Sequence, residues 1–503
     1  MIMRNVLEYL EHSASLYPNK TAAADGETAC TYSQLLGDAR KLGSGIAPHF
    51  AVRTPVPVLM EKGVDTLKVF FGAVYAGCFY VLINPDFPAP RIESILNTLQ
   101  CRRVVTSRKM QEKLPPVSGL EPLFWEDLLE TPEDPALLRR VRENALDTDP
   151  LYANFTSGST GTPKGVVVAH RSVIDFIECF TELFHITEED VIGNQAPFDF
   201  DVSVKDIYSA IKTGARLEII PRSLFSAPAA LLDHLCDRQV TTMVWAVSAL
   251  CLITTFHGLD YRTPQSVNKV LFSGEAMPMK HLKQWMEHLP HARFVNLYGP
   301  TEITCNCTWH EVDRSRVYSD GLPIGRSFPN ERVFLLDEEG HEVQEPGKTG
   351  EICVSGTALA LGYYNDPTQT ESRFALNPLT TAYPERMYRT GDLGWRNQEG
   401  ELFFAGRKDF QIKHMGHRIE LEEIERAVSA VDGVERACCL FDEKKSRLLA
   451  YYVGSPAGRD IRRTLSETLP VFMIPGVYIQ LEHMPMTANG KMDRKALKER
   501  NGR

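Results

Sequence analysis

The chain has 503 residues, of which 43% are hydrophobic and 24% are charged, and its formal net charge is −10 at pH 7. This composition is typical of a globular protein, and the length is too great for one core, so we expect about three domains or large subdomains. The negative charge argues against a dedicated nucleic-acid-binding protein, because a phosphate backbone requires a concentrated positive surface.

Cysteine usage and the apolar segments both favour a cytoplasmic protein. None of the eleven cysteines belongs to a C-x-x-C motif, so we expect neither a zinc site nor a disulfide framework. The N-terminus becomes acidic at Glu8 and lacks an apolar core, unlike a signal peptide. The apolar stretch 67–83 is interrupted by Lys68 and by glycines, which predicts a buried helix running into a strand and no membrane span.

Helices and short β-branched strands are predicted to alternate over most of the chain. We expect a helix at 31–46 and strands at 56–60 and 103–106. Pro57 suits a strand only at its start or at a sheet edge, since proline cannot donate a ladder hydrogen bond. The alternation predicts parallel α/β layers. The charged segment 132–149 is predicted to be a linker or surface excursion.

The pattern changes to strands and turns at Ile324, which predicts a β-rich subdomain at about 324–408. Residues 409–503 are short for a domain but suit a mobile lid. The predicted fold class is therefore α/β. A large N-terminal domain at 1–408 contains layered α/β subdomains and the β-rich subdomain, and a small α+β C-terminal domain follows.

A glycine-rich loop at 156–165 is dense in hydroxyl groups and backbone N–H groups and carries Lys164. It follows a predicted strand at 151–155. Such a loop can wrap a polyphosphate, because N–H groups and an ammonium bind anions. It lacks the Walker A spacing. The alternative is a flexible surface linker, although a stretch of this kind directly after a strand would be an unusual one.

Further motifs follow this loop in order, at 296–302, 350–352, 388–392, 406–413, 416–420 and 489–491. Together they resemble the signatures of the adenylate-forming superfamily, which includes acyl-CoA ligases, luciferases and the adenylation domains of nonribosomal peptide synthetases. The resemblance covers essentially the whole chain. It implies an enzyme that uses ATP and Mg²⁺ to activate a carboxylic acid as its adenylate and then transfers the acyl group to a thiol.

The resemblance implies a nucleotide site built from the loop and the later motifs. The expected ATP-binding residues are Thr156, Ser157, Gly158, Ser159, Thr160, Lys164, Asn296, Tyr298, Thr301, Asp392, Arg407 and Lys491. Tyr298 offers an aromatic face to adenine, and Asp392 can accept both ribose hydroxyls. Without the resemblance, Asp392 could equally be a turn or capping residue. Thr301 offers a hydroxyl to the α-phosphate, and Glu302 offers a hard oxygen ligand to Mg²⁺.

The residues expected to be catalytic are Lys491, Thr301 and Glu302. Adenylation brings two anions together, and the positioned ammonium of Lys491 would lower this electrostatic cost. By composition alone, Lys491 would be a solvated lysine among other basic residues near the end of the chain. The resemblance of the motif at 489–491 reverses that interpretation. Asp409 lies where the superfamily has its hinge between the large and the small domain. The alternative is that Asp409 only caps a helix or a turn. The small domain would close for adenylation and then rotate so that the face near Gly416 meets the thiol.

The segment 200–206 distinguishes the branches of the superfamily. In members that activate amino acids, an aspartate here binds the α-ammonium of the substrate. Asp201 fits that position, whereas Asp199 is out of register. A buried aspartate is costly without a cation, so Asp201 implies a positively charged ligand. The alternative is an ion pair with Lys205, one helical turn away.

Among amino-acid activators, the chain resembles D-alanine–carrier protein ligases, but it carries Ser273 where that family usually has cysteine. The expected substrate-pocket residues are Asp201, Val202, Lys205, Trp245, Leu271, Ser273, Leu297, Cys305 and Asn306. Ser273 and Asn306 can hydrogen-bond a small hydroxyl, and Trp245 should limit size. This favours serine or alanine, L or D, although Lys205 could instead pair with an acidic side chain.

The expected acceptor is the phosphopantetheine thiol of a carrier protein supplied in trans, since nothing after Lys491 resembles a carrier domain. One alternative is an acyl-CoA or aryl-CoA ligase, which would not need Asp201 and would use coenzyme A. Another is a non-catalytic nucleotide-binding protein. Such a protein should have lost one of Lys164, Glu302, Asp392 or Lys491, and all of them are present.

Overall fold

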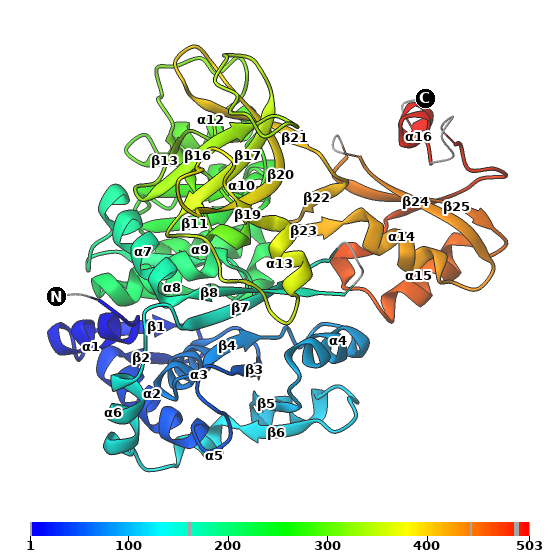
Figure 1. Ribbon diagram of the computed structural model, residues 1–503. Helices are drawn as coiled ribbons and strands as arrows, with labels where there is room; N and C mark the ends of the chain where they lie inside the picture. Colours follow the sequence, from blue (N-terminus) through cyan, green and yellow to red (C-terminus); the bar gives the residue numbers. More distant parts are fainter. Residues whose placement is uncertain (1–2, 159–161, 443–444, 487–491, 502–503) are drawn as a thin grey trace.

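The computed structural model shows a large body joined at one side to a smaller unit formed by the C-terminal residues (Figure 1). The structure describes residues 3–158, 162–442, 445–486 and 492–501. Within these ranges, none of the helices combines the length and the apolar character that crossing a bilayer requires.

Two sheets of mainly parallel strands form the body. The first has the strand order β15-β14-β13-β12-β11-β9-β10-β1-β2, and the second has the order β18-β8-β7-β4-β3-β5-β6. The first sheet consists of β1 (Thr21–Ala24), β2 (Ala29–Thr31), β9 (Val191–Asn194), β10 (Arg216–Ile219), β11 (Thr242–Ala246), β12 (Lys269–Ser273), β13 (Arg293–Tyr298), β14 (Thr308–Glu311) and β15 (Arg326–Ser327). The second consists of β3 (Pro55–Leu59), β4 (Phe79–Leu82), β5 (Arg103–Thr106), β6 (Glu121–Phe124), β7 (Pro150–Thr156), β8 (Lys164–Ala169) and β18 (Gly362–Tyr363).

A layer of helices joins the two sheets through a shared core. These helices are α1 (Leu7–Leu16), α2 (Tyr32–Ile46), α3 (Val64–Tyr75), α7 (His170–Phe184) and α8 (Val202–Thr213). Their buried side chains form one apolar cluster with residues of both sheets, such as Val58 and Val244. The remaining helices of these layers are α4 (Ala89–Leu99), α5 (Trp125–Leu129), α6 (Pro135–Glu143), α9 (Pro228–Asp237), α10 (Val247–Thr255), α11 (Gly258–Tyr261) and α12 (Met279–His288). The layered α/β architecture predicted from the sequence is therefore present.

A five-stranded sheet follows the body in sequence and coincides with the predicted β-rich region. It contains β16 (Glu331–Leu336), β17 (Gly350–Gly356), β19 (Phe374–Leu376), β20 (Arg386–Arg396) and β21 (Leu402–Arg407), and α13 (Pro367–Arg373) lies between two of these strands in the chain. The smaller unit contains β22 (Gln411–His414), β23 (His417–Glu420), α14 (Leu421–Ser429), β24 (Val434–Asp442), β25 (Arg447–Gly454), α15 (Gly458–Ser466), β26 (Val477–Gln480) and α16 (Arg494–Asn501). It has an apolar cluster of its own, which includes Ile424 and Tyr452.

Local sequence explains the elements that position the site. Thr31 and Gln34 form a capping box at the start of α2, with the Thr31 side chain accepting from the Gln34 N–H at 3.2 Å and the Gln34 side chain accepting from the Thr31 N–H at 2.8 Å. Apolar residues dominate β11, β12 and β13, as expected for parallel strands covered on both faces. The helix α8 ends at Gly214, whose positive φ of 78° suits a residue without a Cβ.

The strand expected at 56–60 is present as β3, but two local expectations differ in part from the structure. Pro57 lies in β3, an interior strand between β4 and β5. It is tolerated there because β5 pairs with β3 only from Val58 onward, so one side of Pro57 has no strand partner. The charged segment 132–149 contains the helix α6 in place of a linker. Asp134 caps this helix by accepting from two backbone N–H groups, and Leu138 anchors it in the core.

Candidate active site

Several predicted site residues lie at the carboxyl ends of the parallel strands of the first sheet, where open α/β sheets bind ligands. β12 ends at Ser273 and β13 ends at Tyr298, and the short 3₁₀-helix η3 (Thr301–Ile303) follows β13 directly. The phosphate-binding loop predicted from the sequence connects β7 to β8. The hairpin β22–β23 of the C-terminal unit contacts both regions, as the hydrogen bonds described below establish.

Glu302 is the charged centre of this arrangement, with a side chain that is 0% exposed. Its Oε1 accepts from the Tyr363 hydroxyl at 2.7 Å, and its Oε2 accepts from Nη1 of Arg418 at 2.7 Å. Lys164 Nζ lies 3.9 Å from Oε1. Burial alone would raise the pKa of Glu302, but the Arg418 and Lys164 charges outweigh it and hold this pKa well below its usual range. Glu302 is therefore a carboxylate at neutral pH.

The described residues of the phosphate-binding loop form hydrogen bonds with the backbone of the hairpin and with a side chain of α14. Ser157 Oγ donates to the Arg418 carbonyl at 2.8 Å and accepts from the Glu420 N–H at 3.2 Å. Gly158 offers its carbonyl to Arg426 at 3.4 Å. Ser159 and Thr160, which were also predicted to bind ATP, lie outside the described residues, as does Lys491.

Lys164 and Thr156 face each other across the β7–β8 ladder that carries the loop. Burial and the Arg418 charge together lower the pKa of Lys164 to about 8, although the Glu302 charge acts in the opposite direction. The hydroxyl oxygen of Thr156 is buried without a hydrogen-bond partner among the described residues. An orphaned hydroxyl beside a buried ammonium is a suitable environment for an anionic ligand.

The residues expected to bind the nucleoside also lie together. The Tyr298 hydroxyl donates to Oδ2 of Asp392 at 2.5 Å, and Arg407 donates to the other carboxylate oxygen. Arg407 Nε also donates to Asp409, the predicted hinge residue, at 2.6 Å. Asn296 is 8% exposed and donates from its amide to the Pro323 carbonyl at 2.9 Å. It therefore connects β13 to the start of the β-rich region, and its role as an ATP ligand stays a prediction.

Asp201 lies directly before α8, with a side chain that is only partly exposed. Burial raises its pKa, whereas the charge of Lys205 and the hydroxyl of Thr301 act in the opposite direction. The alternative ion pair between Lys205 and Asp201 is not present among the salt bridges that the described residues form. Its ammonium donates instead to Oδ1 of Asn306 at 2.7 Å.

The strand register decides which predicted pocket residues share a face. Ser273 on β12 is the register partner of Leu297 on β13 and of Ala246 on β11. Register partners in parallel strands point to the same side of the sheet, and successive residues alternate. Leu271 therefore also lies on this face, which is the face covered by α8.

Trp245 belongs to the opposite face of the sheet, contrary to the prediction that it lines the pocket. Its register partner is Phe272, its indole N–H donates to the Gly193 carbonyl at 2.7 Å, and its ring packs at 5.3 Å from that of Phe225. The neighbouring Ala246 occupies the pocket face instead. Successive residues of a strand point to opposite faces, so an error of one position assigns a side chain to the wrong face. The residues of β11 are apolar on both faces, so the sequence does not show which of them face the pocket.

Comparisons with known proteins identify the family of this chain. Residues 10–364 match the family model described as AMP-binding enzyme. The chain belongs to the AMP-binding enzyme family. This finding confirms the superfamily predicted from the motifs.

Relatives of this AMP-binding enzyme include proteins of about the same length and much longer ones. The chain is 32% identical over 507 residues to a D-alanine–D-alanyl carrier protein ligase of Bacillus cytotoxicus, and the match covers 98% of each protein. It is also 32% identical over 506 residues to surfactin synthase subunit 1 of Bacillus subtilis (strain 168), where the match covers 98% of this chain but only 14% of the relative.

A solved structure supports the fold class. The chain superposes with a TM-score of 0.83 and 25% identity on holo-PA1221, which is described as an NRPS protein containing adenylation and PCP domains bound to a vinylsulfonamide inhibitor. The superposition covers 99% of this chain and 84% of that chain. The predicted α/β fold class is thereby confirmed.

Two cationic residues of this AMP-binding enzyme have no role that the sequence alone assigns. Arg418 and Lys413 are register partners in the β22–β23 hairpin, so their side chains share one face of it. Arg418 reaches Glu302, and the charge of Lys413 interacts with those of Asp392 and Asp201. The motifs that contain them were recognised, but only the tertiary contact assigns these cations to the cleft.

The histidine pair His414 and His417 has no carboxylate or cysteine partner at metal-ligand spacing, so the sequence favours surface positions for both. His417 is only partly exposed and packs between two aromatic rings. Its ring stacks on Phe472 with a centroid separation of 3.5 Å and meets the edge of Phe200 at 4.6 Å. Burial lowers its pKa to about 3, so the imidazole is neutral at physiological pH. The backbone N–H of the neighbouring Gly416 donates to Glu275 at 3.2 Å. The tip of the hairpin is therefore fixed to the large domain by both apolar and polar contacts.

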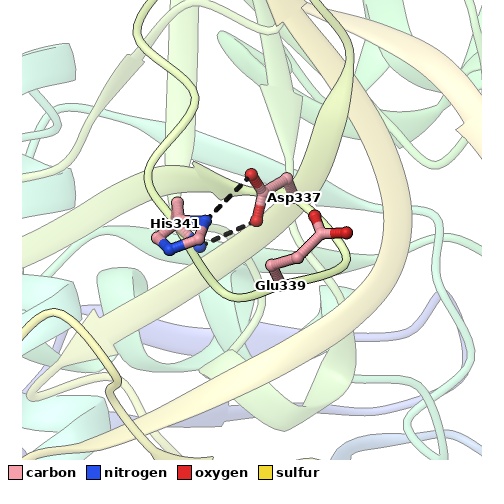
Figure 2. Close-up of side chains that lie close together, drawn as sticks. All are labelled: Asp337, Glu339 and His341. Atoms are coloured by element: carbon pink, nitrogen blue, oxygen red, sulfur yellow. Dashed lines mark hydrogen bonds and ion pairs between the residues drawn. The ribbon is translucent and has the colours of Figure 1, made fainter.

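A separate group of carboxylate and imidazole side chains lies in the turn after β16. Figure 2 shows Asp337, Glu339 and His341 gathered there, with dashed lines only between His341 and Asp337. Asp337 Oδ1 accepts from the His341 N–H at 2.8 Å, which is a common way to stabilise a turn. Glu339 and His341 are exposed. The grouping is explained by the turn itself, and we assign it no role.

Proposed function

We propose that this chain is an ATP-dependent ligase that activates a small amino acid as its adenylate and then loads it onto the phosphopantetheine thiol of a carrier protein. The observation that carries this proposal is the state of Asp201. Its side chain is partly exposed and bonds to the Thr301 hydroxyl, and Lys205, the nearest lysine on the same helix, donates to Asn306. A carboxylate in this position suits the α-ammonium of an amino acid.

The names of the relatives point in the same direction. One group consists of ligases that join D-alanine to a carrier protein, and another consists of subunits of peptide synthases. The full-length match to the first group supports a carrier protein that acts in trans. The proposed substrate is a small amino acid, and the pocket residues Ser273 and Leu297 favour serine or alanine.

The first half-reaction would join a carboxylate oxygen of the amino acid to the α-phosphorus of ATP, and the bond from that phosphorus to the leaving pyrophosphate would break. Lys164, Ser157 and the orphaned hydroxyl of Thr156 would hold the phosphates. Glu302 would hold Mg²⁺, which neutralises phosphate charge when bound. In our proposal Lys491 supplies a further cation to the α-phosphate.

The second half-reaction would form a bond between the carrier's sulfur and the acyl carbon, while the bond from that carbon to the phosphate oxygen of AMP breaks and the thiol proton passes to solvent. The described arrangement suits this step, because the hairpin tip reaches the pocket. A Cβ at Gly416 would lie 3.6 Å from the Cβ of Ala246, which lines the pocket face. We also propose the division into domains at 1–408 and 409–503, with Asp409 as the hinge between the two arrangements. The contact between Asp409 and Arg407 supports this role.

The test is pyrophosphate exchange with all twenty standard amino acids, D-alanine and D-serine. We expect a signal with one or a few small amino acids and its loss in Asp201→Asn. Asp199→Asn is the matched control, because Asp199 is a neighbouring carboxylate outside the proposed pocket, and it should retain exchange. Turnover of fatty or aromatic acids with coenzyme A, without any amino-acid signal, would instead favour an acyl-CoA ligase.

A further inference from the structure

Lys62 belongs to the second sheet's side of the body and binds a segment of the first sheet. It lies between β3 and α3, and the segment that it contacts begins at the end of β9. Its Nζ donates to the carbonyl oxygens of Asn194, Gln195 and Ala196 at 3.3, 3.2 and 3.4 Å, and to Oδ1 of Asn194 at 2.9 Å. An ammonium has three N–H donors and no acceptor, so these contacts use all of its hydrogen-bonding capacity.

The carbonyls that Lys62 binds have little other support. β9 ends at Asn194, so the two residues that follow it lie beyond the strand ladder. Among the described residues, the carbonyls of Gln195 and Ala196 accept hydrogen bonds from Lys62 alone. Ala196 is 3% exposed. A buried carbonyl without a partner is costly, so this segment depends on Lys62 for its conformation.

The same segment is attached to two elements that border the proposed pocket. Asn194 and Asp206 of α8 are both 0% exposed. Asn194 Nδ2 donates to Oδ2 of Asp206 at 2.7 Å, while its Oδ1 accepts from Lys62. Gln195 Oε1 accepts from the N–H of Ala246, at the end of β11, at 3.3 Å. Lys62 therefore holds the segment at the point where β9, β11 and α8 meet.

The chain continues from this segment to Asp201 through tight turns. The Phe200 N–H donates to the Pro197 carbonyl at 3.1 Å, and Ser203 Oγ donates to the Phe200 carbonyl at 2.6 Å. Proline also fixes its own φ. Few backbone dihedral angles are therefore free between Ala196 and Asp201, and a displacement of the first would be transmitted to the second.

We propose that Lys62 is a positioning residue for the amino-acid side of the site, because it fixes the segment 194–196 and thereby the place of Asp201. This inference rests on the proposed function, which takes Asp201 as the anchor of the substrate's α-ammonium. Lys62 acts through the backbone and not by contact with a substrate. The phosphate side should be unaffected, since Lys164 and Glu302 form no hydrogen bond or ion pair with the segment 194–196 among the described residues.

The competing interpretation is that Lys62 only stabilises the contact between the two sheets. Its loss would then lower the free energy of unfolding and leave substrate binding unchanged. Lys68 on α3 provides the comparison, because it is another lysine with partners from its surroundings, Asp38 at 3.2 Å and Asp65 at 3.0 Å. None of its contacts among the described residues reaches the segment 194–201.

The first experiment measures KM for the amino acid and KM for ATP separately in pyrophosphate exchange, with the amino acid that the wild type activates best. Lys62→Met keeps the length of the side chain and removes its donors. We expect KM for the amino acid to rise roughly tenfold or more, since a small misplacement of a binding group has effects of this size, while KM for ATP stays within about twofold. Lys62→Arg retains donors and charge and should recover most of the loss. Lys68→Met should lower the melting temperature and leave both constants within about twofold.

The second experiment measures amide hydrogen exchange and needs no substrate. Peptides that span residues 194–203 should exchange at least several-fold faster in Lys62→Met than in the wild type. The same peptides should exchange at the wild-type rate in Lys68→Met. Thermal melting establishes that each variant is folded.

Three results would overturn the inference. They are an unchanged KM for the amino acid in folded Lys62→Met, a parallel rise of KM for ATP, and unchanged hydrogen exchange in the peptides that span 194–203. A wild type that activates no amino acid would instead contradict the proposed function. Hydrogen exchange would still decide in that case whether Lys62 fixes the segment.

Discussion

Arg418 donates to Glu302 at 2.7 Å, and this buried contact joins the C-terminal hairpin to the carboxylate that we propose as the Mg²⁺ ligand. The second oxygen of Glu302 is bound by Tyr363. The same hairpin engages Ser157 of the phosphate-binding loop. Docking of the hairpin and binding of Mg²⁺ with a polyphosphate therefore require the same groups. In our interpretation, Arg418 replaces the metal as the counter-ion of Glu302 after pyrophosphate leaves.

Arg418→Ala should impair thioester formation more than adenylation. Removing one partner of a buried ion pair costs on the order of 3–5 kcal/mol, so we expect the docked arrangement to lose at least about tenfold in population. Pyrophosphate exchange, which requires the other arrangement, should change by less than a few-fold. Single-turnover loading of a carrier protein and exchange measured side by side give the two values. Arg463→Ala, on the exposed face of α15, is the control. Equal losses in both assays would contradict the separate role of Arg418.

Asp392→Asn should weaken nucleotide binding without affecting the amino-acid side of the site. The change removes the negative charge that Tyr298 and Arg407 hold in place, and an amide cannot accept two ribose hydroxyls as a carboxylate does. We expect KM for ATP to rise roughly tenfold, because hydrogen bonds to charged groups contribute about 1.5–3 kcal/mol, while KM for the amino acid stays within about twofold. Initial rates with either substrate varied separately provide the measurement. A parallel rise of both constants would indicate a general distortion of the site.

Much of this site was predictable because its residues occur in contiguous motifs. The loop at 156–165 and the residues Tyr298, Glu302 and Asp392 were identified from the sequence. Among the described residues, the structure brings Lys164 to Glu302 and Tyr298 to Asp392, and their roles in binding stay predictions. The layered α/β fold also followed from the alternation of helices and strands. Motifs carry this information because a ligand contact often depends on a few neighbouring residues.

Features that depend on tertiary placement were not predictable. The side of the sheet to which Trp245 points depends on strand register, and a fully buried strand shows no alternation that reveals it. The ion pair of Arg418 joins residues that are 116 positions apart. His417 was misjudged for the same reason, since Phe200 and Phe472 come from distant segments. Periodicity describes one element at a time, so contacts between elements require coordinates.

KM for ATP should rise at alkaline pH, because Lys164 loses its positive charge there. Burial lowers the pKa of this lysine to about 8, so the ammonium is present below that pH and is lost as the pH rises through it. We expect KM for ATP to increase several-fold between about pH 7 and pH 9, since the uncharged amine no longer attracts phosphate. Lys164→Arg is the matched variant, because a guanidinium stays charged over this range, and its KM should be nearly independent of pH. An equal rise in the variant would show that another group is responsible.

The pair Trp245 and Ala246 tests the assignment of the pocket face. Trp245→Phe removes the hydrogen bond to the Gly193 carbonyl and part of the ring packing on the far side of the sheet. It should lower the free energy of unfolding by about 1–3 kcal/mol and leave the order of preferred amino acids unchanged. Ala246→Leu adds volume on the pocket face and should reduce exchange roughly tenfold or more with little change in stability. Denaturant unfolding and the amino-acid exchange panel measure both effects. If Trp245→Phe altered the panel and Ala246→Leu did not, the pocket would lie on the face that the strand register excludes.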